Sequence, residues 1–258
     1  MSDFTEQNLV EPIDGPLPIV FQDEHYVVVY KPAGLLVHRS WIAKQATVFA
    51  MQLLRDQLGQ YVYPVHRLDR PTCGLLVMAL SSEAAAKLSE CFSNREVSKS
   101  YVAIVRGYIE GEHHLDYPLV EEQDQMTDAL AQQDKDAQPA VTDYRGLALA
   151  EISYSTGRFP TSRYSLLRLN PLTGRKHQLR RHMHHISHPI IGDTTHGDGK
   201  HNRLFRELGH PGLWLFADQL RFTHPYSGEI VSCKSPLPPR WQRVLEQLSW
   251  NSSLLLSD

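Results

Sequence analysis

Apolar residues gather in short runs along most of the 258-residue chain, and polar or proline-containing stretches separate the runs. Residues 26–30, 75–80 and 101–108 are mostly apolar runs of the length typical of buried strands. Shorter runs predict further strands at 140–144, 147–154, 163–169, 213–216, 220–223 and 230–232. The pattern therefore predicts a chain that is rich in β structure from Ile19 onward.

Four segments instead carry apolar residues at helical spacing, and we expect helices there. They are 47–58, between a capping Thr47 and Gly59; 81–94; a segment after Gly174; and 238–248. Strands and helices mix without the strict alternation of a doubly wound fold. We therefore expect an α+β fold with a large mixed, mostly antiparallel sheet flanked by helices.

Composition is ordinary for a globular protein, with 41% hydrophobic and 21% charged residues. No apolar run approaches the length of a membrane span, and the first basic residue is Lys31, so neither a membrane anchor nor a signal peptide is predicted. Cys73, Cys91 and Cys233 form no CxxC pair, which argues against a disulfide frame or a zinc ribbon. We expect a cytoplasmic location.

One nonapeptide, HRLDRPTCG at residues 66–74, carries the clearest candidate chemistry. It sets Asp69 between Arg67 and Arg70, and nearby positive charge favours an ionised carboxylate. The loop runs directly into the strand predicted at 75–80, which would mount that carboxylate rigidly. Because Asp is also common in turns without any catalytic role, spacing alone leaves both interpretations open.

Five motifs resemble, in order, those of the RluA-type pseudouridine synthases. HRLDRPTCG is similar to the family's H-R-L-D-x-x-T-S-G signature, except that Cys73 stands where the family usually has Ser. The other four are KPAG at 31–34, KSYVA at 99–103, TGRKHQLRRH at 173–182 and HPIIGD at 188–193. The resemblance covers about residues 19–250.

The resemblance implies the pseudouridine synthase fold and an isomerase that converts a uridine in RNA to pseudouridine. It implies that Asp69 is the nucleophile, that Tyr101 lies against the target base and that Arg180 is the partner of Asp69. Leu179 is expected to pack in the active site. Substrate and product are isomers, so no cofactor and no metal is expected. Attack at ribose C1′, attack at uracil C6 and a glycal route all remain open.

RNA contacts are expected from a second group of basic residues. The target base must leave its stack, and the resemblance implies that Arg67 fills the gap. Arg70, Arg175, Lys176 and Arg181 are further candidates for RNA binding. Although the net charge is −3, residues 158–206 hold ten Lys or Arg against two Asp, and residues 110–136 hold nine carboxylates against one Lys. This distribution predicts one strongly basic face.

The predicted organisation is a flexible, acidic N-terminal arm at 1–18, a catalytic domain at 19–250 and a short C-terminal tail at 251–258. The segments 115–120 and 138–142 resemble the tRNA-modifying branch of the family. That resemblance implies a tRNA partner, with uridine 65 near the junction of the acceptor and T stems as the target. A ribosomal RNA uridine is the alternative. Neither a membrane nor an obligate protein partner is expected.

Two other protein classes fit these residues less well. A retaining glycosidase needs a second carboxylate as acid, and none lies in the motifs around Tyr101 or Arg180. A non-catalytic RNA-binding module would explain the basic span but has no use for Asp69. A zinc site at His177 and His184 is disfavoured, because no Cys is near and no HExxH spacing occurs. Contacts with RNA or with a helix C-terminus explain these histidines more simply.

Overall fold

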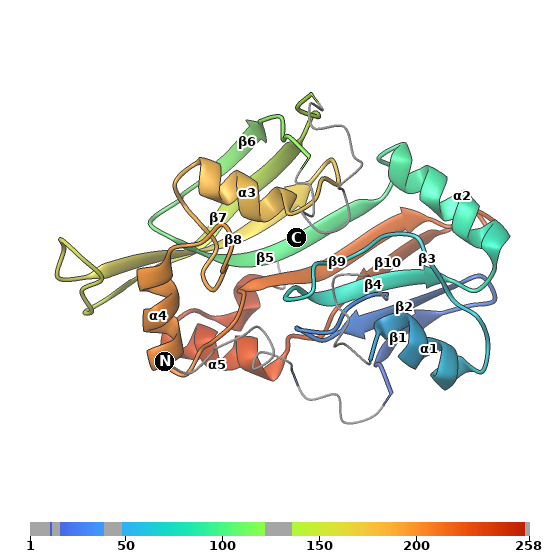
Figure 1. Ribbon diagram of the computed structural model, residues 1–258, viewed down its shortest axis with the longest axis horizontal. Coiled ribbons are helices and arrows are strands. Elements are labelled where there is room, and N and C mark those ends of the chain that lie inside the picture. Colours follow the sequence, from blue (N-terminus) through green and yellow to red (C-terminus); the bar gives the residue numbers. More distant parts are fainter. Residues whose placement is uncertain (1–10, 12–15, 39–47, 122–135, 256–258) are drawn as a thin grey trace, which may run out of the picture. The chain divides into compact units, whose positions relative to one another are not determined.

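The computed structural model describes residues 11, 16–38, 48–121 and 136–255. Within them it contains ten strands and five α-helices, which are labelled in Figure 1. The chain divides into two compact units, each made of three segments. Unit 1 comprises Met1–Lys99, Leu119–Gln138 and Gln219–Ser235, and unit 2 comprises Ser100–Pro118, Pro139–Asp218 and Pro236–Asp258. The segment 19–250, predicted as one domain, therefore contributes to both units.

Unit 1 is an antiparallel arrangement of strands with two helices. Its elements are β1 (Ile19–Gln22), β2 (Tyr26–Lys31), α1 (Ala50–Leu58), β3 (Tyr63–Pro64), β4 (Cys73–Ala79), α2 (Ser82–Ser93), the second half of β9 (Leu215–Thr223) and β10 (Ile230–Lys234). β2 pairs with β1 and β4, β3 pairs with β4, and β10 pairs with β9. All seven residues of β4 are buried, which explains the continuous apolar run in the sequence.

The core of unit 1 joins its strands to α2. Tyr26 of β2, Val77 of β4 and Phe222 of β9 belong to one buried cluster with Leu88 of α2. The hydroxyl of Ser81 accepts a hydrogen bond from the Ala84 amide at 3.1 Å, so α2 begins where the sequence predicted. β4 and α2 therefore form a packed support on which the loop before β4 is mounted.

Unit 2 contains the remaining elements. They are most of β5 (Ser98–Arg106), β6 (Glu112–Asp116), β7 (Val141–Ile152), β8 (Ser162–Pro171), α3 (Gln178–His185), α4 (Gly199–Glu207), the first half of β9, α5 (Pro239–Gln247) and the 3-10 helix Ser252–Leu255. β8 pairs with β5 and β7, and β7 also pairs with β6, all antiparallel. Leu179, Met183 and Ile186, predicted to share the inner side of α3, pack together in the core of unit 2.

The structure joins two pairs of predicted runs into single strands. The runs at 140–144 and 147–154 form the single strand β7, whose register shifts between Gly146 and Ala148. A side chain at Gly146 would lie 2.3 Å from the carbonyl oxygen of Ile109, so the close approach there requires glycine. The end of the run at 213–216 and the whole run at 220–223 likewise belong to one strand, β9, and Gln219 between them pairs with Lys234 of β10.

Some elements were not predicted, and some predictions concern residues that the structure does not describe. β6 and α4 were not predicted, and α4 buries only Leu204 and Phe205 among apolar residues, which is too few for a clear periodic signal. Thr47, most of the N-terminal arm, most of the acidic span at 110–136 and residues 256–258 lie outside the described residues. At the end of the arm, Leu17 is buried. Among the described residues, no helix is both long and apolar enough to cross a membrane.

Candidate active site

In unit 1, Asp69 lies on the loop that leads into β4. Asp69 and Arg70 are half-buried, whereas Arg67 is exposed. The Thr72 amide donates to the Asp69 carbonyl at 3.1 Å and closes a turn, and Cys73 begins β4 as a fully buried residue. The small Cys73 side chain therefore fits the position where the resembling family usually has Ser.

The KPAG motif holds this loop from the side of β2. The Gly34 amide donates to the Arg70 carbonyl at 2.8 Å, and Arg70 Nε donates to the Gly34 carbonyl at 3.1 Å. The buried Lys31 Nζ donates to the carbonyl oxygens of Arg70, Pro32 and Leu35 at 2.8–3.2 Å. The residue directly after Asp69 is therefore fixed through both its backbone and its side chain.

Lys31 also brings a charge near Asp69. Burial lowers the pKa of the Lys31 ammonium to about 8, although Cys73 and Asp69 nearby act in the opposite direction. Below that pH the side chain is a buried cation within electrostatic reach of the Asp69 carboxylate. The sequence indicated the motif but no role for Lys31, because its contacts depend on how the chain folds back.

His66 anchors the start of the same loop. Its Nε2 accepts a hydrogen bond from the Val77 amide of β4 at 3.0 Å, and its ring stacks on Phe92 with centroids 4.9 Å apart. Burial, with a smaller effect of Lys99, lowers the pKa of His66 to about 3, so the ring is a neutral acceptor at physiological pH. The loop around Asp69 is thus held at both ends by unit 1.

In unit 2, Tyr101 and α3 carry the other candidate residues. Tyr101 is half-buried on β5, opposite Leu169 of β8, and packs against the same core cluster as Leu179. Arg175 and Lys176 precede α3 and are half-buried, as is Arg181 within it. Unit 2 therefore gathers an aromatic side chain and the predicted basic residues on two neighbouring elements of one core.

Gln178 fixes the turn before α3. Its side-chain oxygen accepts from the Thr173 hydroxyl at 2.7 Å and from the Arg175 amide at 3.0 Å. Its side-chain nitrogen donates to the Val141 carbonyl and to the Thr142 hydroxyl, both at 3.0 Å. The glutamine of the GRKHQLR motif thereby ties the helix N-terminus to β7.

Arg180 is held by a buried carboxylate. Its Nε and Nη2 donate to the two oxygens of Asp193 at 2.7 and 2.8 Å, and the two side chains are 5% and 0% exposed. Burial acts to raise the pKa of Asp193, but the Arg180 hydrogen bonds and charge, with the amides of His196 and Thr195, hold it below its usual range. Asp193 closes the HPIIGD motif, and sequence reasoning had not assigned it a role.

The Asp193 loop is fixed in turn by α4. Asn202 Nδ2 donates to the Asp193 carbonyl at 2.7 Å, and Asn202 Oδ1 accepts from the Gly192 amide at 2.7 Å. Gly192 has φ 81°, and a side chain there would lie 1.7 Å from the Gly212 carbonyl oxygen, so only glycine fits. A continuous set of contacts therefore runs from α4 through Asp193 to Arg180.

The histidines around α3 have structural partners. His182 bridges the Thr142 hydroxyl at 2.9 Å and the Tyr117 carbonyl at 3.0 Å, and burial lowers its pKa. His184 contacts the His196 carbonyl at 2.8 Å, and His177 lies 3.3 Å from His196. Within the described part of the chain, no three His, Cys, Asp or Glu side chains are grouped to hold a metal ion.

The two units each present part of the predicted catalytic set. Asp69 belongs to unit 1, whereas Tyr101 and Arg180 belong to unit 2. The predicted convergence of these three side chains in one cleft, and the RNA contacts of Arg67, Arg70, Arg175, Lys176 and Arg181, stay predictions.

Comparison with known proteins identifies the class. The family model described as RNA pseudouridylate synthase matches residues 25–185. The chain therefore belongs to the RNA pseudouridylate synthase family, whose members are isomerases, and the expected pseudouridine synthase fold and enzyme class are confirmed.

Individual relatives are similar over nearly the whole chain. The chain is 57% identical to tRNA pseudouridine synthase C of Vibrio vulnificus (strain CMCP6), over 93% of this chain and 98% of the relative. It is 50% identical to tRNA pseudouridine synthase C of Haemophilus influenzae, over 92% and 99%. Among solved structures, human RNA pseudouridylate synthase domain containing 1 aligns with a TM-score of 0.68 and 26% identity, over 93% of this chain and 98% of that one.

Asp193→Asn should slow turnover by about a hundredfold, because Arg180 loses its charged, bidentate partner and its position. Asp218→Asn is the matched control: Asp218 is 3% exposed and pairs with the buried Arg168 at 3.0 Å, also in unit 2. Both changes should lower the free energy of unfolding, each by roughly 3 kcal/mol. Single-turnover rates and thermal melts would be measured together. Equal rate losses in the two variants would contradict a specific role for Asp193.

Proposed function

We propose that this enzyme is a tRNA pseudouridine synthase that isomerises uridine 65, near the junction of the acceptor and T stems, with Asp69 as the nucleophile. The observation that carries the substrate class is the 57% identity, over 93% of the chain, to an enzyme named tRNA pseudouridine synthase C. A uridine in ribosomal RNA is the alternative substrate within the same chemistry.

The contacts of the segment that resembles the tRNA-modifying branch support this proposal. Tyr117 follows β6, and its amide donates to the Ala140 carbonyl at 3.0 Å, so the two resembling segments pair with each other. The Tyr117 carbonyl bonds to His182, and its ring stacks on His185 with centroids 3.5 Å apart. The features shared with that branch therefore lie against α3, the helix that carries Arg180 and Arg181.

The reaction breaks the bond between ribose C1′ and uracil N1, turns the base and joins C1′ to C5. The C5 proton is lost, and N1 ends protonated, so atoms balance without a cofactor. In the proposed mechanism Asp69 acts on the substrate as an ionised carboxylate. The guanidinium of Arg180, which also binds Asp193, orients the Asp69 carboxylate. Tyr101 lies against the base with its hydroxyl available for the proton at C5. Arg67 occupies the space that the base leaves.

Asp69→Asn should reduce turnover to below about a thousandth of the wild-type value, because the amide is no nucleophile. Release of tritium from RNA containing 5-tritiated uridine reports the reaction directly. RNA affinity should stay nearly unchanged, since the substitution removes no phosphate contact. Asp56→Asn, at an exposed carboxylate paired with Arg55, serves as control and should retain full activity. Activity of Asp69→Asn within tenfold of the wild type would refute the assignment.

The substrate proposal is tested by deleting the gene and mapping pseudouridine in total RNA. We expect loss of pseudouridine at position 65 of tRNA, restored by the wild-type gene but not by the Asp69→Asn gene. Loss from a ribosomal site, with every tRNA site retained, would overturn the tRNA substrate and leave the isomerase chemistry intact.

A further inference from the structure

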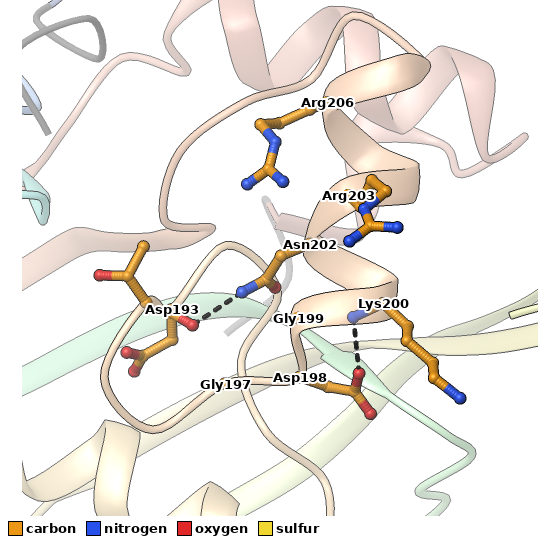
Figure 2. A pocket seen from close by; sticks show the side chains of 9 residues that line it. Asp193, Gly197, Asp198, Gly199, Lys200, Asn202, Arg203 and Arg206 are labelled. Carbon is orange, nitrogen blue, oxygen red and sulfur yellow. Dashed lines mark hydrogen bonds between the residues drawn. The ribbon is translucent and has the colours of Figure 1, made fainter. Parts of the chain in front are cut away.

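Unit 2 has an open hollow beside α4 that lies outside the predicted catalytic residues. Its volume is about 620 Å³. The lining comes from the loop after Asp193 and from one side of α4 (Figure 2), and it includes Asp193, Asp198, Lys200, Asn202, Arg203 and Arg206. The hollow is therefore built from one continuous stretch of chain, residues 193–206, in which no helix was predicted.

Three cations of this lining project from successive turns of α4. Lys200, Arg203 and Arg206 are exposed and spaced three residues apart, which keeps them on one side of the helix. Among the described residues, no carboxylate lies within ion-pair distance of any of the three. Glu207, the nearest acidic residue along the helix, accepts a hydrogen bond from the Tyr154 hydroxyl at 2.8 Å. The three positive charges are thus available to a ligand.

The two carboxylates of the lining are already paired with other arginines. Asp193 is bonded to Arg180, and Asp198 contacts Arg106 Nη1 at 2.6 Å. Neither Arg180 nor Arg106 belongs to the lining. Because both negative charges are compensated from outside, the hollow presents a net positive surface, which selects for anionic groups.

The spacing of the cations favours a chain of phosphates over a single small anion. From Lys200 to Arg206 the helix rises about 9 Å, at 1.5 Å per residue. That length spans more than one phosphate of a nucleic-acid strand, since successive phosphates of one strand of duplex DNA rise only about 3.4 Å along the helix axis. Asn202, between these cations, also holds the backbone at Asp193, the partner of Arg180. A polyanion on α4 would therefore contact the same rigid element that positions Arg180.

We propose that Lys200, Arg203 and Arg206 form an RNA-docking site on α4 that binds backbone phosphates at a distance from the target base. The site rests on the proposed RNA substrate and adds a contact surface to it. Its contribution is to affinity rather than to the chemical step, since none of the three side chains is among the predicted catalytic residues. Exposed cations of this kind add a salt-dependent term to binding.

The test compares two triple variants on the RNA whose pseudouridine is lost in the deletion strain. Lys200→Gln, Arg203→Gln and Arg206→Gln remove the α4 cations. Arg55→Gln, Arg221→Gln and Arg243→Gln remove three exposed cations elsewhere and serve as the matched control. RNA affinity is measured between 50 and 200 mM salt, alongside KM and kcat. Using the RNA identified by mapping keeps a failed tRNA assignment distinct from a failed docking site.

The α4 variant should lower the logarithmic salt slope by about 2 to 3, at roughly 0.7 to 0.9 for each lost phosphate contact. KM should rise at least tenfold with kcat within threefold of the wild type, whereas the control should leave the slope and KM unchanged. The charge-preserving set Lys200→Arg, Arg203→Lys and Arg206→Lys should restore the slope. If the triple Gln variant fails to fold, Arg206→Gln alone should lower the slope by roughly 0.7 to 0.9.

Three outcomes would overturn the proposal. The first is an unchanged salt slope in the folded α4 variant, and the second is an equal loss of slope in the control variant. The third is a site for a small anion only: inorganic phosphate binds the wild type and not the α4 variant, while both bind RNA equally well.

Discussion

The buried guanidinium of Arg180 constrains the part of unit 2 that surrounds it. A buried cation is costly unless a carboxylate and further hydrogen bonds satisfy it, and Asp193 supplies a bidentate partner. That carboxylate needs its own support, which comes from the amides of Thr195 and His196. The backbone of the loop is fixed by Asn202 of α4. The HPIIGD motif and helix α3 are therefore two parts of one electrostatic assembly, although they are separate along the sequence.

In unit 1, backbone and side-chain contacts fix the loop that carries Asp69, the proposed nucleophile. The loop around Asp69 is fixed by its neighbours: His66 is bonded to β4, and Arg70 is bonded to Lys31 and Gly34 at the end of β2. The motifs KPAG and HRLDRPTCG thus act together as a rigid support. For the proposed role of Asp69, such preorganisation would remove the cost of ordering its carboxylate during the reaction.

The sequence predicted most of the strands, α2, the inner side of α3 and the family, because these depend on local apolar patterning and on contiguous motifs. It did not predict that Asp193 pairs with Arg180, because that contact joins residues thirteen positions apart through a loop. The sequence also did not predict that Lys31 binds the loop that carries Asp69, or that α4 is a helix. Lys31 donates to a carbonyl 39 positions away, and α4 relies on buried His201 and Asn202 rather than on apolar periodicity. Apolar periodicity is visible in a short stretch of sequence, whereas tertiary contacts between polar groups leave no such local pattern.

We propose that two separately built supports deliver Asp69 and Arg180 to the same uridine. The decisive measurement is a crystal structure of the enzyme bound to an RNA that carries the target uridine. We expect the Asp69 carboxylate within about 4 Å of the Arg180 guanidinium, the range of an ion pair, with the extruded base against Tyr101. Asp69 and Arg180 on opposite faces of the complex, or a base bound away from Tyr101, would contradict it.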